Sequence, residues 1–379
     1  SKDKDDVNSQ LRLLPAPSTE VNTNLGLRTS ASHWKISALS ELPELPPCTV
    51  LTTPDVVQHF GAFDEQGQRY VEFGKENRRY FPRRLTLKTV QYQNPLDEIL
   101  VELLTSDLLY AKREPTDLRE STPLLFERQA YDETLAHSGK RNPFYESQVL
   151  HQFCSSPSRV QVLCKQLETG KTNFKFQHQE RLTQFIRDHA KEIEQAARPK
   201  NDNKLNELVK IIEEANGEKV TVFCHYIETA NRLRDGLRKR IRRLKVETTA
   251  EMHSPDLDEL LQRFAPVATE VLEEDRHPEE EIQVLICTNA LSEGFNLQDA
   301  RILVNYDLPW TILQLAQRMG RILRPWKTPR DILIYNFIPS TMDHPRLRNA
   351  RRWQRRLLER SEQHRSFAQI PVLIRQDIS

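Results

Sequence analysis

The sequence contains little cysteine and no long apolar run. Five cysteines occur in 379 residues, and the closest two, Cys154 and Cys164, are ten positions apart. This spacing offers no Cys-x-x-Cys zinc site, and the odd number gives no complete disulfide framework. Nowhere do about 18 uncharged apolar residues follow one another, so no segment is predicted to span a bilayer. An initiator Met and a basic leader before an apolar stretch are also missing, and we expect a fragment of a longer soluble protein.

A phosphate-binding loop of the form GxxxxGK[ST] is missing as well. The one Gly-Lys-Thr, Gly170–Thr172, has Lys165 where the first glycine is required. Two acidic pairs, Asp97–Glu98 and Asp258–Glu259, each open a helical pattern, whereas a metal-binding pair of this kind ends a buried strand. We therefore predict no metal ligands in this chain.

Net charge is close to zero, with 55 Lys and Arg against 54 Asp and Glu, but its distribution is uneven. Residues 232–245 hold eight basic residues and one acid, and His344–Arg365 holds eight arginines and two acids. Glu270–Glu281, in contrast, holds seven acids and one arginine. Such runs create local fields, although each is equally typical of a solvated helix face or loop. The Arg-rich run could track DNA phosphates or brace a neighbouring domain.

The first 200 residues divide into two parts. Residues 1–82 are polar and proline-rich, and we expect an irregular trailing part of an upstream domain. Residues 85–92 alternate apolar and polar positions, which predicts a half-buried strand. Beyond them, helical periodicity dominates, with the turn-like Cys154–Ser158 as an interruption. We therefore predict a mostly helical connecting or insert region over residues 83–200.

Residues 201–340 alternate amphipathic helices with short strands that are apolar throughout. The predicted strands are Val220–Cys224, Val246–Ala250, Val284–Cys287, Ile302–Tyr306 and Ile332–Ile338. Such strands are typical of a parallel sheet covered by helices on both faces, so the predicted fold class is α/β. Ligand loops then lie at the carboxyl ends of the strands. Residues 341–379 are predicted to form an Arg-rich C-terminal helix and tail.

Two stretches in this region carry candidate chemistry. A polar loop, Thr288–Ala300, follows one strand, and its small side chains and backbone N–H groups could face phosphates. Further on, the sequence QRMGRILR spans Gln317–Arg324. On a predicted helix near residues 311–322, Arg321 and Arg324 would share one face. Two guanidinium groups on one face can stabilise a transferring phosphoryl group.

These stretches together resemble the second RecA-like lobe of superfamily-two helicases. They are most similar to the Swi/Snf-type ATPases, including the bacterial RNA-polymerase-associated branch. Residues 220–226 resemble the family's motif IV region, SEGFNLQDA at 292–300 its motif V, and QRMGRILR its motif VI. The similarity is specific over residues 203–340, loose over 83–200 and absent over 1–80. It implies a RecA-like parallel sheet with helices on both faces.

The resemblance also implies roles for individual residues. Arg321 and Arg324 would be arginine fingers supported by Gln317, acting on ATP and Mg²⁺ that are held mainly by an N-terminal RecA-like lobe outside this chain. Glu293, Gly294 and Gly320 would contribute to the nucleotide site. The residues expected along the nucleic-acid backbone are His225, Tyr226, Thr288, Asn289 and Ser292.

Two departures from the Swi/Snf pattern stand out. Pro325-Trp326 follows the last arginine where that family usually has Ile or Leu, Gly and Gln. Glu293 occupies a position where the family commonly has a small residue, although many helicases carry Glu there. The resemblance therefore does not predict which contacts close the cleft at Pro325-Trp326.

The resulting hypothesis is the C-terminal motor half of an ATP-dependent double-stranded DNA translocase, an ATP hydrolase that is incomplete without its other lobe. Expected partners are double-stranded DNA, the N-terminal lobe and proteins of a larger complex, with no membrane. We expect a cytoplasmic protein, nucleoid-associated if bacterial. One alternative is a non-catalytic helicase-derived module that binds nucleic acid or protein. Another is a strand-separating DNA or RNA helicase. A P-loop upstream of Ser1 would favour the motor over the module.

Overall fold

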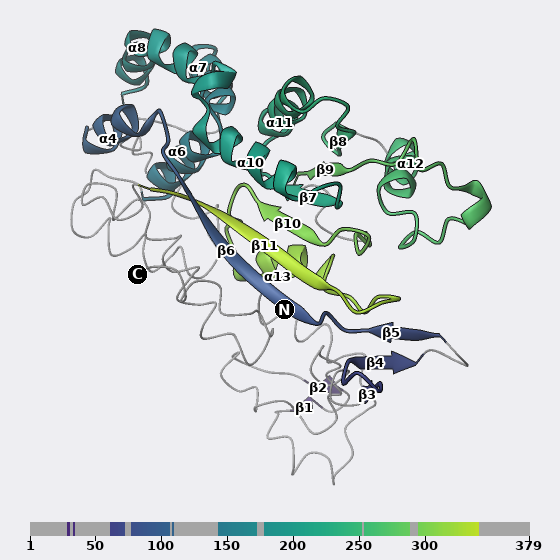
Figure 1. Ribbon diagram of the computed structural model, residues 1–379. Helices are drawn as coiled ribbons and strands as arrows, with labels where there is room; N and C mark the ends of the chain where they lie inside the picture. The colour runs from purple at the N-terminus through teal and green to yellow at the C-terminus, as the bar shows by residue number, and fades with distance from the viewer. Residues whose placement is uncertain are drawn as a thin grey trace. The chain divides into compact units, whose positions relative to one another are not determined.

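The computed structural model describes residues 29–30, 33–34, 61–72, 77–106, 108–109, 143–172, 178–251, 254–288 and 295–340 (Figure 1). The chain divides into two compact units, Ser1–His59 and Phe60–Ser379. In the first, Thr29–Ser30 (β1) pairs antiparallel with His33–Trp34 (β2). The predicted Arg-rich helix and tail, residues 341–379, lies outside the described residues.

Six strands form the central sheet of the second unit, in the order β6-β11-β10-β7-β9-β8. All neighbouring strands are parallel. Their bounds are Arg84–Tyr92 (β6), Val220–Phe223 (β7), Val246–Thr248 (β8), Val284–Cys287 (β9), Ile302–Asn305 (β10) and Asp331–Pro339 (β11). The four-residue strands β7, β9 and β10 are buried throughout, as expected for strands covered on both faces.

Helices cover both faces of this sheet, which confirms the predicted fold class. On one face lie α10 (Asn203–Glu214) and α11 (Ile227–Arg240), packed on side chains such as Val222 and Val304. On the other lie α12 (Ser254–Phe264) and α13 (Ile312–Gly320), packed on the alternate side chains, such as Phe223 and Leu303. Successive strand residues point to opposite faces, so each apolar strand serves two separate cores.

The helical region before the sheet has its own core. It consists of α4 (Asp97–Thr105), α6 (Pro143–Ser155), α7 (Pro157–Glu168), α8 (Gln179–Asp188) and α9 (Ala190–Ala196), with a 3₁₀ turn at Pro199–Asn201 (η2). Buried side chains such as Leu100, Phe153 and Leu163 form one apolar cluster. The turn predicted at Cys154–Ser158 is the junction of α6 and α7, where the Ser156 hydroxyl accepts a hydrogen bond from the Arg159 N–H and caps α7.

Residues 84–92 form β6, which confirms the strand predicted over residues 85–92, and β6 pairs along its whole length with β11 in the central sheet. Within the expected irregular segment, Ala62–Phe63 (β3), Arg69–Glu72 (β4) and Arg78–Tyr80 (β5) form an antiparallel sheet. These strands are two to four residues long and have no buried side chain, so they leave no sustained apolar pattern. The domain boundaries stay a prediction.

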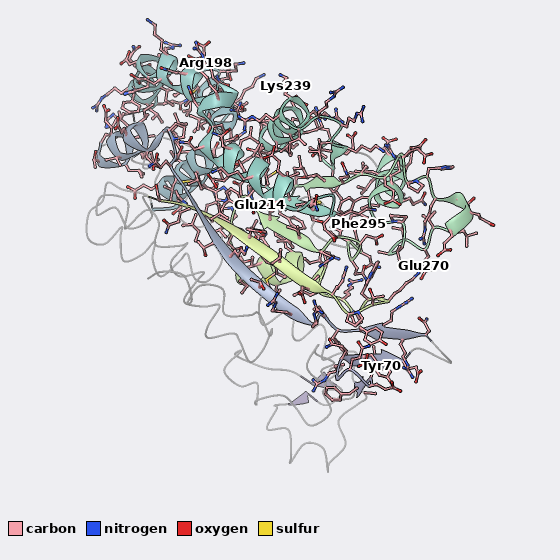
Figure 2. The ribbon with its side chains drawn as sticks, in the orientation of Figure 1. Tyr70, Arg198, Glu214, Lys239, Glu270 and Phe295 are labelled. Atoms are coloured by element: carbon pink, nitrogen blue, oxygen red, sulfur yellow. The ribbon has the colours of Figure 1, made fainter. Side chains whose placement is uncertain are left out.

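The acidic stretch Glu270–Glu281 forms an exposed connection between α12 and β9 that includes a 3₁₀ turn at Glu273–Asp275 (η3). Glu270, labelled in Figure 2, has a left-handed backbone with φ of 60°. No helix among the described residues has the length and apolarity needed to cross a bilayer. Within the same part of the chain, no group of three or more His, Cys, Asp and Glu side chains is placed to hold a metal ion.

Candidate functional site

The candidate residues lie toward opposite ends of the central sheet. His225, Thr288 and Asp307 each follow the carboxyl end of a strand, β7, β9 and β10 respectively. Helix α13 follows β10 and leads back to the start of the parallel strand β11, so its last residues lie toward the amino ends of the strands. The segment Arg321–Arg324 comes directly after α13 and therefore lies at that second end.

A buried ion pair occupies the carboxyl end. Asp307 follows β10, and its Oδ1 accepts a hydrogen bond from Lys204 Nζ of α10 at 2.8 Å. Its Oδ2 accepts from the Ser155 hydroxyl at 2.6 Å and from the His225 N–H at 2.9 Å. Burial alone would raise the pKa of Asp307, but the charge and hydrogen bond of Lys204 and the Ser155 hydroxyl lower it to about 2. This carboxylate therefore joins the helical region to the sheet.

Lys204 has further contacts that satisfy its ammonium group. Its Nζ donates to the Cys154 carbonyl at 2.8 Å and lies 4.0 Å from the centre of the Tyr306 ring. Its side chain is only 6% exposed. Three hydroxyls extend the network, because Thr229 is hydrogen-bonded to both Ser155 and Ser156 at 2.9 and 2.8 Å. The side chains at this junction thus bond chiefly to one another.

His225 and Tyr226, the two residues of the motif IV region that are predicted to contact nucleic acid, lie in an aromatic cluster. The Tyr226 hydroxyl is 3.0 Å from Nδ1 of His151, whose ring stacks on Trp310 with centroids 4.4 Å apart. The His225 ring contacts His151 edge to face at 4.6 Å. Burial lowers the pKa of His151 to about 3 and also lowers that of His225, so both rings are neutral at pH 7. Both predicted residues are thus packed against α6 and the segment after β10.

Thr288 follows β9 and is only 4% exposed, while its N–H donates to the Thr249 hydroxyl at 3.3 Å. The other predicted residues of this loop, Asn289, Ser292, Glu293 and Gly294, lie outside the described residues. The structure therefore brings His225, Tyr226 and Thr288 to one end of the sheet and gives no geometry for the rest of that set.

The arginine pair lies beyond the end of α13. Thr311 caps the start of this helix by accepting a hydrogen bond from the Gln314 N–H. We expected the helix to run to about residue 322, but it ends at Gly320, with Arg321 as its C-cap. Pro325 disfavours helical backbone at the residue before it, which is Arg324. Arg321 and Arg324 therefore do not share a helix face.

Instead, both arginines reach the same short segment of the β9–β10 connection. Arg321 Nη1 donates to the carbonyl of Phe295 at 3.1 Å, and Arg324 Nη1 donates to Asn296 Oδ1. Figure 2 labels Phe295 at the start of this segment. The Arg321 side chain is half-buried, whereas Arg324 is exposed. Two guanidinium groups are therefore held beside adjacent residues, an arrangement suited to an anionic group such as a phosphate.

The remaining motif VI residues have different surroundings. Gln317 is half-buried within α13. Gly320 is exposed, and a Cβ added there would meet no heavy atom within 4 Å, so no neighbouring backbone from the described part of the chain lies close to it. Arg318 is fully buried, and its Nη1 donates to Asn305 Oδ1 at 3.1 Å and to the Asp307 carbonyl at 2.7 Å. Arg318 thus connects α13 to the end of β10.

Comparison with known families identifies the part of the chain that carries these features. Residues 203–325 match the helicase conserved C-terminal domain. This region, about a third of the chain, is similar to a helicase C-terminal domain. The match spans α10 to the arginine segment, which confirms the predicted resemblance to the second RecA-like lobe of superfamily-two helicases.

Individual relatives align with parts of this domain. RNA polymerase-associated protein RapA of Vibrio parahaemolyticus is 35% identical over 134 residues, which cover 35% of this chain and 13% of that protein. The uncharacterized ATP-dependent helicase YqhH of Bacillus subtilis is 54% identical over 55 residues, 14% of this chain and 10% of the relative. The alignments thus span only about a tenth of the length of these relatives.

Among solved structures, the Sulfolobus solfataricus SWI2/SNF2 ATPase core in complex with dsDNA covers 76% of this chain and 46% of its own, with 15% identity and a TM-score of 0.37. The C-terminal part of the Fun30 ATPase domain covers 71% of this chain and 88% of its own, with 13% identity and a TM-score of 0.40.

Sequence reasoning missed several residues that the helicase C-terminal domain buries. Lys204 and Asp307 are 103 positions apart, and neither lies in one of the three motifs that carry the resemblance. Arg318 lies inside motif VI, but the residue type alone does not show whether an arginine is buried or exposed. Arg330 lies six positions beyond Arg324 and gave no sequence signal.

Proposed function

We propose that this chain is the C-terminal motor half of an ATP-dependent translocase on double-stranded DNA, similar to the Swi/Snf-type ATPases. One observation carries this proposal. Arg321 and Arg324 donate to adjacent residues, Phe295 and Asn296, so two cationic side chains contact the same short segment of the β9–β10 connection. The helicase C-terminal domain match over residues 203–325 supports it.

In this proposal, ATP and Mg²⁺ are bound mainly by an N-terminal RecA-like lobe of the same protein. Arg321 and Arg324 reach the γ-phosphoryl group and stabilise the charge that develops during its transfer. Gln317 supports them from α13. The open space beside Gly320 leaves room for the approach of the nucleotide or the other lobe. Glu293 and Gly294 belong to the same connection and would contribute to the nucleotide side of it.

The nucleic acid is assigned to the carboxyl end of the sheet. His225, Tyr226, Thr288, Asn289 and Ser292 would line its sugar-phosphate backbone. Support comes from the positions of His225 and Thr288, which follow the neighbouring strands β7 and β9 and therefore lie at the same, carboxyl end of the sheet. Phosphate contacts carry no base-edge information, and the phosphate group is common to DNA and RNA. Double-stranded DNA is proposed because SEGFNLQDA and QRMGRILR resemble motifs V and VI of the Swi/Snf-type ATPases.

The test uses the full-length protein and measures ATP hydrolysis without nucleic acid, with duplex DNA, with single-stranded DNA and with RNA. Arg321→Ala and Arg324→Ala are each expected to lower the stimulated rate by roughly two to four orders of magnitude, while ATP binding is retained. Lys327→Ala is the matched control, since it removes an exposed positive charge three positions beyond Arg324. Wild-type hydrolysis rates in both arginine variants would refute the arginine-finger assignment.

A second pair of assays separates the motor from its alternatives. Displacement of a third strand from a triplex reports translocation on duplex DNA, and strand separation on forked DNA or RNA reports a helicase. We expect triplex displacement without strand separation. Nucleic-acid binding with no ATP turnover would instead identify a non-catalytic module.

A further inference from the structure

Arg330 is a buried cation at the amino end of the sheet, directly before β11. It is 6% exposed. Its Nη1 donates to the carbonyls of Gln298 and Ala300, the latter at 3.4 Å, and its Nη2 donates to the Ile322 carbonyl at 2.9 Å. Burial lowers the pKa of Arg330 to about 10, which leaves the group charged at neutral pH. One side chain thus bonds to the main chain of two separate segments.

The two segments are the ones that hold the arginine pair. Gln298 and Ala300 end the β9–β10 connection, in which Phe295 and Asn296 accept from Arg321 and Arg324. Ile322 lies between the two arginines in sequence. A main-chain hydrogen bond from the Leu297 N–H to the Arg321 carbonyl, 3.2 Å long, joins the same segments. The side-chain hydrogen bonds of Arg330 therefore add to this main-chain hydrogen bond, and together they fix the backbone around Arg321 and Arg324.

Trp326 extends this connection to the small antiparallel sheet. Its ring centroid lies 4.6 Å from the guanidinium carbon of Arg330. Its backbone forms an isolated bridge with Tyr80 of β5. The Tyr80 N–H donates to the Trp326 carbonyl, with nitrogen and oxygen 2.6 Å apart, and the Trp326 N–H donates to the Tyr80 carbonyl at 2.8 Å. Pro325-Trp326 is the place where the chain departs from the usual Swi/Snf sequence. The departure thus brings a tryptophan that covers Arg330 and bonds to β5.

We propose that Arg330 is a positioning residue for the arginine pair. Its guanidinium group fixes the main chain of residues 321–324 against residues 298–300, so that Arg321 and Arg324 keep their positions relative to each other. This inference rests on the proposed function of the pair. Arg330 itself is buried, and it acts on phosphoryl transfer only through the backbone that carries Arg321 and Arg324. A displacement of about 1 Å in a group that contacts the reacting atoms can cost roughly 10²-fold in rate.

The test measures kcat and KM for ATP in the full-length protein with saturating duplex DNA. Arg330→Met is expected to lower kcat by about 10- to 100-fold, with KM for ATP within about twofold, because nucleotide binding is assigned mainly to the other lobe. Arg330→Lys, which keeps the charge, is expected to recover part of kcat. The matched control is Arg276→Met, since Arg276 also donates to a main-chain carbonyl, that of Val271, but in the acidic connection after α12.

A double-mutant comparison separates positioning from simple stabilisation. Adding Arg330→Met to the Arg321→Ala/Arg324→Ala variant is expected to cause no further loss of kcat, because the groups that Arg330 positions are already gone. Multiplied losses, or a wild-type kcat per folded Arg330→Met molecule with a lower melting temperature, would overturn the inference. If Arg330→Met does not fold, the kcat of Arg330→Lys decides: an undiminished value overturns the inference.

The same experiment distinguishes the two levels of the proposal. Loss of hydrolysis in Arg321→Ala and Arg324→Ala, with an unaffected Arg330→Met, refutes the positioning role and leaves the proposed function standing. Undiminished hydrolysis in the two alanine variants refutes the proposed function and removes the basis of the inference.

Discussion

The Lys204–Asp307 pair at the carboxyl end of the central sheet and Arg324 at the amino end hold their charges in different ways. At the carboxyl end, Lys204 and Asp307 are 6% and 3% exposed and bond to each other and to neighbouring hydroxyl, carbonyl and N–H groups. At the amino end, the Arg324 side chain is exposed and donates to Asn296. Buried charges of the first kind fix structure, because leaving either one uncompensated is costly. An exposed guanidinium of the second kind can exchange its partner for a ligand at small cost.

The largest effect is expected when the buried pair is broken. Lys204→Met leaves the Asp307 carboxylate buried without its cation, and should lower the free energy of unfolding by about 3–5 kcal/mol. Urea denaturation of the chain measures this loss. Lys210→Met is the control, because Lys210 lies on the same helix, is 62% exposed and pairs with Glu207 at 2.7 Å. Its loss should be about 0–1 kcal/mol.

Adding Asp307→Asn to Lys204→Met should restore part of the stability, because the uncompensated charge is then removed as well. Equal losses for Lys204→Met and Lys210→Met would contradict the difference between the buried pair and a surface pair.

A smaller effect is expected from pH. The pKa of buried His151 is about 3, below its ordinary value near 6.5, so between these values the unfolded chain binds a proton that the folded chain does not. Stability should therefore fall as pH drops below about 6.5, by up to roughly 1.4 kcal/mol per pH unit. The lowered pKa of His225 acts in the same direction.

Urea denaturation between pH 7 and pH 4.5 measures this slope, in a range that lies above the pKa of Asp307 at about 2. His151→Phe removes the titrating group while keeping a ring to stack on Trp310, and should make the slope shallower. His277→Gln, at a side chain that is 64% exposed, should leave the slope unchanged. An identical slope in the wild type and His151→Phe would show that His151 does not cause the loss.

The smallest effect on stability is expected from Arg324. Arg324→Ala should change the free energy of unfolding by less than about 0.5 kcal/mol, because an exposed side chain contributes little to the folded state. The same variant is expected to lose ATP hydrolysis in the full-length protein. A loss of stability close to that of Lys204→Met would mean that Arg324 serves the fold, and the contrast between the two ends would fail.

The parts of the fold that depend on local pattern were predictable. Buried strands such as Val284–Cys287 are continuous apolar runs, which the sequence shows directly. The end of α13 was wrong by two residues because the periodic pattern continues to Leu323, whereas Pro325 acts on the backbone before it. Placement of β6 beside β11 depends on pairing across more than two hundred residues, which no local pattern encodes.

The candidate site was predictable only where a motif marks it. Arg321 and Arg324 follow from the QRMGRILR spacing, but their shared contact with residues 295–296 depends on how the β9–β10 connection folds back. Lys204 and Arg330 occupy positions where a cation is ordinarily exposed, and only tertiary contacts reveal that they are buried. Long-range partners, here carbonyls and a carboxylate from distant segments, decide which charged residues are internal.

The parallel arrangement of β9 and β10 has a geometric consequence. Because both strands point the same way, the chain that joins them must leave the carboxyl end of the sheet at Thr288 and reach the amino end by Ala300. The described part of this connection, residues 295–300, has therefore returned to the amino end, where Phe295, Asn296 and Gln298 accept hydrogen bonds from three different arginine side chains.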